Sequence, residues 1–244
     1  MRGIVPGLFF FRWVAINIST FMKIGIIVAM QSELALVLEA LGNFKECVAT
    51  VGTVYTGRLF GHDIMVTKCG IGKVNAAVGA LDLINCFAPD VVINTGVAGG
   101  TGAEAKIGDV ILASGVAYHD TWCGPGTERG SVQGLPDIFV PQHDTATLAA
   151  EIGAGTGLVA SGDIFVSEPD DFRRVMAVRP DAAAIDMESG AIAQVCFLKS
   201  VPFLCLRIVS DTPGDGGNEA QYVNFWSEAP RAVFGKLVSL IERL

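Results

Sequence analysis

The chain has 244 residues, of which 51% are hydrophobic and 17% charged, with a formal net charge of -8. This composition supports a large buried core, suits one large α/β domain and excludes a disordered chain. Lys and Arg are scattered rather than gathered into a basic face, so neither a nucleic acid nor an anionic membrane surface is an expected partner.

Residues 1–21 precede the first strand-like run and are predicted to be an extension. They combine a basic residue with an apolar stretch, as a signal peptide does, but Arg12 interrupts the stretch and no A-x-A cleavage site follows. A membrane span would take roughly 20 apolar residues, which this stretch does not reach. We expect a non-native or over-extended start before a single domain at 22–244. A targeting segment or a genuine extra element are the alternatives.

Apolar runs bounded by Gly or polar residues recur along the rest of the chain. Several are continuous rather than alternating, which is typical of strands covered on both faces. The predicted strands are KIGIIVA (23–29), DIMVTKC (63–69), DVVINTG (90–96), DVILASGVAY (109–118), GLVASGD (157–163) and FLCLRIVS (203–210).

Helical patterns lie between several of these strands. The run 32–41 places Leu34, Leu38 and Leu41 on one face, and the tail 219–244 has an apolar stripe that Pro230 breaks or kinks. Strand–helix alternation predicts an α/β fold with a mostly parallel or mixed sheet flanked by helices. Further helices are predicted at 72–87 and 187–200, and a long surface loop at 119–145.

Six cysteines and three histidines are present, but no CxxC or HExxH spacing. Several cysteines lie in apolar runs, so buried thiols in a reducing compartment such as the cytoplasm are expected. No zinc site and no cofactor are predicted.

Two glycine-rich segments follow predicted strands. KCGIGKVNAA (68–77) fails the Walker pattern at Thr67 and Val74 and the dinucleotide pattern at Asn75, so its glycines are predicted to form a tight strand-to-helix turn. In NTGVAGG (94–100), glycines would let the backbone approach a ligand, although an ordinary tight turn is the alternative.

Three acids lie near the carboxyl ends of predicted strands: Glu33, Glu188 and Asp211. Each alone is explained by the roughly 0.3–1 kcal/mol that a carboxylate contributes at a helix N-terminus. Together they suit cleavage of an N-ribosidic bond. One acid protonates the departing base, one carboxylate activates water, and one holds the ribose and stabilises a cationic sugar. Phe165 is placed to stack on a purine, with a plain core position as its alternative.

The ordered motifs of residues 22–244 resemble those of the 5′-methylthioadenosine/S-adenosylhomocysteine nucleosidases of the nucleoside phosphorylase superfamily. The resemblance implies a three-layer α/β/α sandwich around a central mixed sheet, usually a homodimer, acting on a small nucleoside in methionine salvage. It rests on IVAMQSE (27–33), KCGIGKVNAA, NTGVAGG, KIGDVILAS (106–114), AYHD (117–120), SGDIFV (161–166), AIDMES (184–189) and RIVSD (207–211).

The resemblance also implies a role for each site residue. Glu33 would activate the attacking water, with Arg207 helping to position it. Asp211, held beside Ser210, would protonate adenine N7 and contact the exocyclic amine. The remaining substrate contacts would come from Phe165 and Val166 at the adenine and from Met187 and Glu188 at the ribose, with Ala29 and Val97 as further substrate-binding residues.

Two departures from the family pattern stand out. The family often has Ser where this chain has Val97, and that hydroxyl helps hold the water. The segment 121–130 does not align with the one that reaches the neighbouring subunit's alkylthio pocket, although Trp122 is a candidate there.

Three rival functions share this core. A purine nucleoside phosphorylase calls for Arg near the first strand-to-helix loop, yet residues 29–35 hold neither Arg nor Lys. A futalosine-type hydrolase is poorly separated by sequence. A non-catalytic nucleoside-binding relative would be expected to lose one or more of the three acids, and all three are present.

Overall fold

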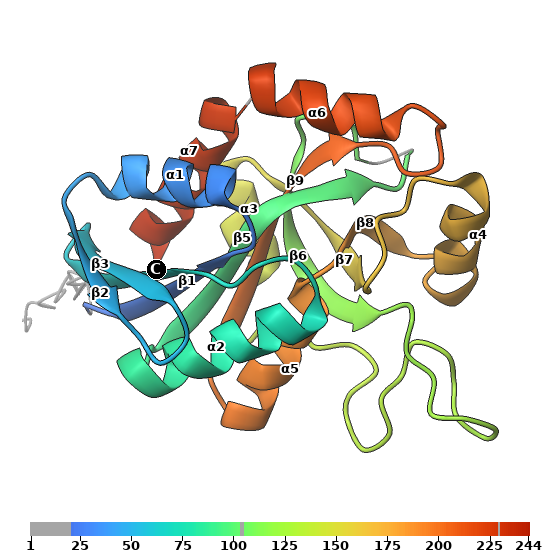
Figure 1. Cartoon of the computed structure of the whole chain (residues 1–244), viewed down its shortest axis with the longest axis horizontal. Helices are drawn as coiled ribbons and strands as arrows, with labels where there is room; N and C mark the ends of the chain where they lie inside the picture. The colour runs from blue at the N-terminus through green and yellow to red at the C-terminus, as the bar shows by residue number, and fades with distance from the viewer. Residues whose placement is uncertain (1–20, 103–104, 229) are drawn as a thin grey trace, which may run out of the picture.

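The computed structural model describes residues 21–102, 105–228 and 230–244 (Figure 1). All but the last residue of the predicted extension 1–21 therefore lies outside the described residues. Within them no helix is long and apolar enough to cross a membrane.

All six predicted strands are present. They are β1 (Lys23–Val28), β4 (His62–Lys68), β5 (Val91–Gly100), β6 (Val110–Tyr118), β7 (Gly155–Ser161) and β9 (Phe203–Asp211). Three strands were not predicted: β2 (Phe44–Val48), β3 (Thr53–Leu59) and β8 (Ala182–Asp186). β2 is exposed along its length and β8 is mostly alanine, so neither carries the apolar signal of a buried strand.

One mixed sheet contains all nine of these strands, in the order β2-β3-β4-β1-β5-β8-β7-β6-β9. β5 also pairs with β9, so β5, β9, β6, β7 and β8 close a ring. β1 runs parallel to β4 and β5, and β5 runs parallel to β9. The carboxyl ends of these four strands therefore lie at the same edge of the sheet (Figure 1).

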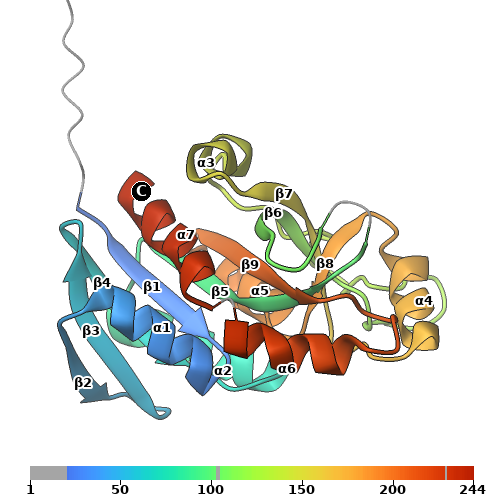
Figure 2. The same cartoon turned by 90° about the horizontal axis from the view of Figure 1, so that it is seen from above.

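Helices cover both faces of the sheet (Figure 2). The predicted helices are α1 (Gln31–Leu41), α2 (Lys73–Phe87) and α5 (Ser189–Lys199), with the tail divided at Pro230 into α6 (Asn218–Glu228) and α7 (Pro230–Arg243). Two short helices, α3 (Thr145–Ile152) and α4 (Pro169–Val178), were not predicted. Residues 119–144 contain no helix or named strand, as expected of a long loop.

Two apolar layers fill the space between the sheet and the helices. One lies under α2 and α5, and the other lies under α1, α3 and α7. The arrangement is the expected three-layer α/β/α sandwich with a central mixed sheet. The expectation of buried thiols holds for Cys196 and Cys205 but is wrong for Cys47, Cys86 and Cys123, which are exposed because they lie on the edge strand β2, a helix surface and the long loop.

Candidate active site

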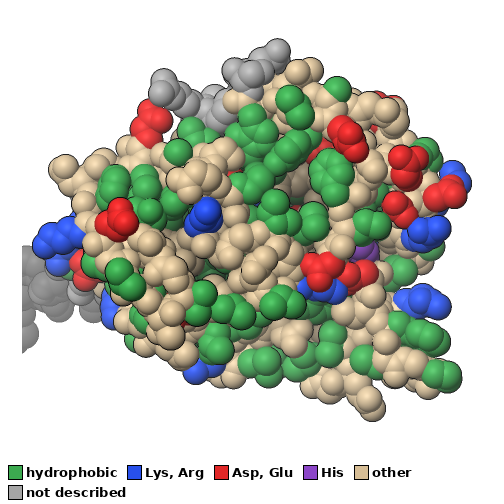
Figure 3. Space-filling view, viewed as in Figure 1, with side chains coloured by type: hydrophobic (Ala, Val, Ile, Leu, Met, Phe, Trp, Pro, Cys, Tyr) green, Lys and Arg blue, Asp and Glu red, His purple; other side chains and the backbone are tan. Residues whose placement is uncertain are grey.

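A cavity of about 530 Å³ opens at the carboxyl ends of β1, β5 and β9. In the space-filling view, hydrophobic side chains gather around a hollow on this face (Figure 3). Eight of the ten predicted site residues line the cavity: Glu33, Val97, Phe165, Val166, Met187, Glu188, Ser210 and Asp211. Ala29 and Arg207 are buried and are not among the lining residues.

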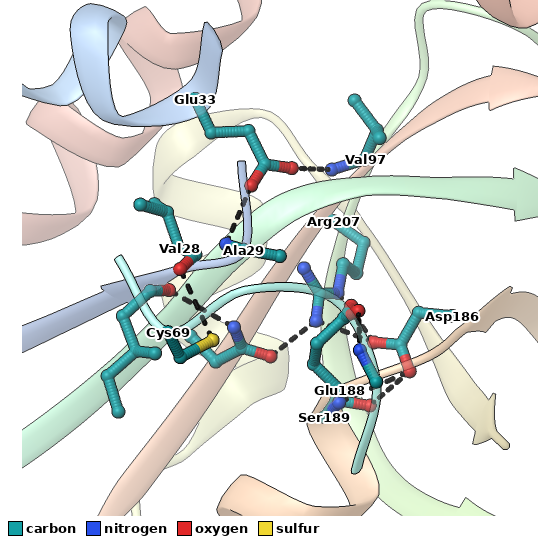
Figure 4. A network of polar contacts seen from close by, with 12 residues as sticks. Val28, Ala29, Glu33, Cys69, Val97, Asp186, Glu188, Ser189 and Arg207 are labelled. Carbon is teal, nitrogen blue, oxygen red and sulfur yellow. Dashed lines mark hydrogen bonds and ion pairs between the residues drawn. The ribbon is translucent and has the colours of Figure 1, made fainter. Parts of the chain in front are cut away.

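Glu33 is held at the third position of α1 by three backbone hydrogen bonds, of which those from Ala29 and Val97 are drawn in Figure 4. Its Oε2 accepts from the N–H groups of Ala29 at 2.8 Å and Met30 at 2.9 Å, and its Oε1 accepts from the N–H of Val97 at 3.1 Å. The side chain is only 2% exposed, and burial raises the pKa of this carboxyl against the opposing effect of Arg207. A raised pKa and fixed geometry are features of a general base.

Glycine at position 96 is required by the close approach of two charged groups. A Cβ on Gly96 would collide with Oε1 of Glu33 and with the guanidinium of Arg207. The glycine-rich end of β5 therefore brings the backbone against the carboxylate of Glu33.

Glu188 precedes α5 and reaches across to the turn between β4 and α2 (Figure 4). Its Oε1 accepts a 2.9 Å hydrogen bond from the N–H of Gly72, which with Gly70 has a positive φ, as the predicted tight turn requires. Burial and the nearby Asp186 raise the pKa of Glu188 to about 7. One Glu188 oxygen is engaged by the backbone, so the other is available to a ligand hydroxyl.

Arg207 lies between the two glutamates, buried and outside the lining of the cavity (Figure 4). Its Nε donates at 2.7 Å to Oδ2 of Asp186, and its guanidinium also donates to Oδ1 of Asn94. Asp186 in turn accepts from the hydroxyl of Ser189 at 2.9 Å. This buried cation supplies positive potential to Glu33 and Glu188 from behind.

Asp211 ends β9 and is 2% exposed. Burial raises its pKa, and two hydrogen bonds oppose that rise. The hydroxyl of Ser210 donates to Oδ1 at 2.7 Å, and Nδ2 of Asn218 donates to Oδ2 at 3.1 Å. The same Nδ2 donates at 3.0 Å to the carbonyl oxygen of Val166. A carboxyl with a raised pKa beside an apolar cavity is suited to general acid catalysis.

An aromatic pair borders the cavity between the loop after β7 and α6. Phe165 is 42% exposed and meets Tyr222 edge to face, with ring centroids 5.8 Å apart. The Tyr222 hydroxyl lies 3.0 Å from Sδ of Met30, which also lines the cavity. Phe165 is thus a cavity residue, and the plain core alternative is wrong.

Sequence reasoning missed four residues of this site: Asn94, Asp186, Asn218 and Tyr222. Asn94 and Asp186 stood inside the motifs NTGVAGG and AIDMES, so a buried polar residue at the end of an apolar run was an available signal. Asn218 and Tyr222 lie in a helix that no motif marks, and only the fold brings them to Asp211 and Phe165.

The cavity can hold a flat apolar base and a polar sugar at once. Phe165 provides an aromatic ring and Val166 provides backbone polar groups. The carboxyl groups of Glu33, Glu188 and Asp211 lie at different positions in the cavity wall. None of the described lining residues is Lys or Arg. Within the same described residues, no group of three or more His, Cys, Asp and Glu side chains is arranged to hold a metal ion.

Comparison with known proteins places the chain in a family. The model of the phosphorylase superfamily matches residues 23–242. A 5′-methylthioadenosine/S-adenosylhomocysteine nucleosidase of Haemophilus influenzae is 34% identical over 230 residues, which cover 91% of this chain and 100% of the relative.

Solved structures agree in fold. A nucleosidase of the same name from Colwellia psychrerythraea, in complex with adenine, is 34% identical with a TM-score of 0.85, covering 92% of this chain and 96% of that one. A futalosine hydrolase mutant of Helicobacter pylori is 26% identical with a TM-score of 0.84, covering 91% and 99%.

Proposed function

The chain belongs to the phosphorylase superfamily and, within it, to the 5′-methylthioadenosine/S-adenosylhomocysteine nucleosidases, and from this premise we propose that it hydrolyses the N-glycosidic bond of both nucleosides. The products are adenine and the 5′-thioribose. The observation that carries the proposal is the buried carboxylate of Glu33, fixed by three backbone N–H groups in the wall of a cavity that also holds Glu188 and Asp211.

Asp211 is the proposed general acid. Protonation of adenine N7 by a carboxyl of raised pKa lets the base leave as the C1′–N9 bond breaks. Ser210 holds the carboxyl, Phe165 stacks on the base, and the backbone of Val166 reads the adenine edge.

Glu33 is the proposed general base for the attacking water. Ala29 and Val97 hold its carboxylate through their N–H groups, and Arg207 acts on it from beneath the cavity. Glu188 accepts hydrogen bonds from the ribose hydroxyls with the oxygen that Gly72 leaves free, and Met187 packs on the sugar.

Water rather than phosphate is the proposed nucleophile because of the charge around Glu33. A phosphate needs cationic donors, and the described cavity wall contains none. The buried carboxylate of Glu33 would repel a phosphate dianion. Phosphorolysis is therefore a weaker alternative to hydrolysis. The second alternative is hydrolysis of futalosine, which the likeness to the Helicobacter pylori futalosine hydrolase supports.

We propose that the enzyme is a cytoplasmic homodimer of methionine salvage, with residues 22–244 as its single catalytic domain. An exposed apolar surface on two adjacent helices supports the dimer. Val74, Val78 and Leu81 of α2 repeat at helical spacing, and Phe197 and Leu198 are exposed on the neighbouring α5. Contiguous apolar surface of this kind marks protein–protein interfaces.

The test is a substrate panel with the purified chain. Methylthioadenosine, S-adenosylhomocysteine, inosine and futalosine are supplied in turn, with and without phosphate, and the released base is identified by chromatography. Adenine from the first two without phosphate supports the proposal. Hypoxanthine from futalosine alone, or release that depends on phosphate, would overturn it.

A further inference from the structure

Asn218 joins the proposed acid to the strand-end loop that faces the base. Its side chain is 1% exposed, and its single NH2 group donates both to the carbonyl oxygen of Val166 at 3.0 Å and to Oδ2 of Asp211 at 3.1 Å. These two oxygens lie on separate elements, the loop after β7 and the end of β9.

The orientation of the Asn218 amide follows from its partners. A carbonyl oxygen can only accept, so the NH2 side of the amide must face Val166. The second hydrogen of the same NH2 group then points to Oδ2 of Asp211. Because an NH2 group can only donate, it cannot accept a hydrogen bond from a protonated Oδ2. Oδ2 of Asp211 is therefore held as an acceptor.

The other oxygen of Asp211 meets a partner of a different kind. The hydroxyl of Ser210 lies 2.7 Å from Oδ1 and 3.3 Å from the carbonyl oxygen of Ala98. A hydroxyl both donates and accepts. When Oδ1 carries a proton, Ser210 can accept it in a hydrogen bond and turn its own hydrogen to Ala98.

We propose that Asn218 is a positioning residue that decides which oxygen of Asp211 carries the catalytic proton, and that it thereby selects 6-amino over 6-oxo purines. The proton resides on Oδ1 and passes to the purine N7 while the electron pair of the C1′–N9 bond moves to the base, leaving Asp211 as a carboxylate. Oδ2 and the Val166 carbonyl remain two fixed acceptors for an exocyclic amine.

This inference rests on the proposed function, and it makes a specific demand on the purine. A 6-oxo purine presents an oxygen where adenine presents its amine. That oxygen would face the Val166 carbonyl, which can only accept, and Oδ2 of Asp211, which Asn218 prevents from becoming a donor. Without Asn218 the proton is free to move to Oδ2, and the carboxyl can then donate to that oxygen. Discrimination between the two bases should relax.

The experiment compares methylthioadenosine with methylthioinosine in Asn218→Ala and in Asn218→Asp, which keeps the side-chain volume. The exposed Asn224→Ala in the same helix is the control. We expect the ratio of kcat/KM for the two substrates to fall at least about tenfold in both Asn218 variants, the scale of one hydrogen bond to a charged group, and to stay unchanged in the control.

The pH profile gives a readout that a merely structural role would not move. Asn218 stabilises the ionised form of Asp211, so its loss raises the pKa of that carboxyl further, and the alkaline limb of kcat/KM moves to higher pH. The substitution Asn218→Ala replaces none of the other titratable residues of the cavity wall, which are Glu33, Asp186, Glu188, Glu219 and Tyr222.

The two failures are distinguishable. If the wild-type chain releases no adenine, the proposed function is wrong. If the wild type is active but both Asn218 variants keep the substrate ratio and the alkaline limb, the inference alone is wrong. If both variants lose activity entirely, binding of free adenine against hypoxanthine by calorimetry decides, because a retained preference for adenine overturns the inference and a lost one supports it.

Discussion

The N–H of Val97 donates a 3.1 Å hydrogen bond to Oε1 of Glu33, although 64 positions separate the two residues in the chain. The bond ties the start of α1 to the glycine-rich end of β5. It fixes the carboxylate that we assign to water activation, and it places the Val97 side chain, which lines the cavity, beside that carboxylate.

Replacing Glu33 with Gln should abolish most activity. The amide cannot take a proton from water, and loss of a general base typically costs about 10²–10⁴ in kcat. The NH2 group of the new Gln side chain would also face at least one of the three backbone N–H groups that now donate to Glu33. Because two donors cannot pair, the free energy of unfolding should fall by about 1–3 kcal/mol. Adenine release and chemical denaturation measure the two effects. Glu39→Gln, on the exposed side of the same helix, is the matched control, and equal rates in both variants would remove Glu33 from the mechanism.

Replacing Val97 with Thr should raise kcat. Thr has nearly the shape of Val but adds a hydroxyl at the cavity wall beside Glu33, where it can hold the attacking water. We expect a gain of about threefold to tenfold, the value of one hydrogen bond in the transition state. Val97→Ala, which removes bulk without adding a hydroxyl, should give no gain. A rise in Val97→Ala equal to that in Val97→Thr would show that space, and not the hydroxyl, limits the rate.

As the pH rises, Glu188 should lower the free energy of unfolding and increase the affinity for a nucleoside. Its pKa is raised from 4.5 to about 7 in the folded protein, chiefly by burial. Between these two values the folded state keeps a proton that the unfolded state has released, so this group lowers stability as the pH rises through that interval. Ribose binding needs the carboxylate, so the affinity for a nucleoside analogue should increase over the same interval.

Glu188→Gln tests both statements. Gln can still accept from Gly72 but carries no charge, so the variant should melt at a higher temperature than the wild type at pH 8 and at a similar temperature at pH 4.5. Its affinity for the analogue should be weak at both. Melting curves and calorimetric titration at the two pH values suffice, and a wild type that gains stability with rising pH relative to the variant would contradict the assignment.

Phe165→Ala should weaken base binding with a smaller effect on the chemical step. Stacking of a base on an aromatic side chain is worth about 1–3 kcal/mol, so KM should rise by about 5-fold to 150-fold. Phe44→Ala is a matched control, because Phe44 is also 42% exposed but lies on the edge strand β2. Equal KM values in the two variants would exclude stacking on Phe165.

The buried strands could be predicted from the sequence because a short, continuous apolar run between Gly or polar residues is typical of a strand covered on both faces. The strands β2, β3 and β8 could not, since their residues become strands only by pairing with neighbours that are already in place. The helix α4 was missed because four of its ten residues are charged and only Val175 is buried, so it carries little apolar signal.

Part of the site could be predicted because the order of the strands places their carboxyl ends together. Acids at the carboxyl ends of parallel strands meet at one edge of the sheet, which is why Glu33 and Asp211 could be placed together from sequence. Arg207 was expected near the water, yet the structure buries it beneath the cavity, where Asp186 and Asn94 bind it. The contact of Asn218 with Asp211 depends on the path of residues 212–217, which no local pattern fixes.

Hydrolysis in water enriched in oxygen-18 shows directly whether water or phosphate attacks C1′ of the nucleoside. The purified chain is given methylthioadenosine in the presence of ordinary phosphate, and the sugar product is analysed by mass spectrometry. We expect adenine together with free 5-methylthioribose that carries one oxygen-18 at C1, at a rate that phosphate does not change. Methylthioribose 1-phosphate without the label, or no release of adenine, would contradict it.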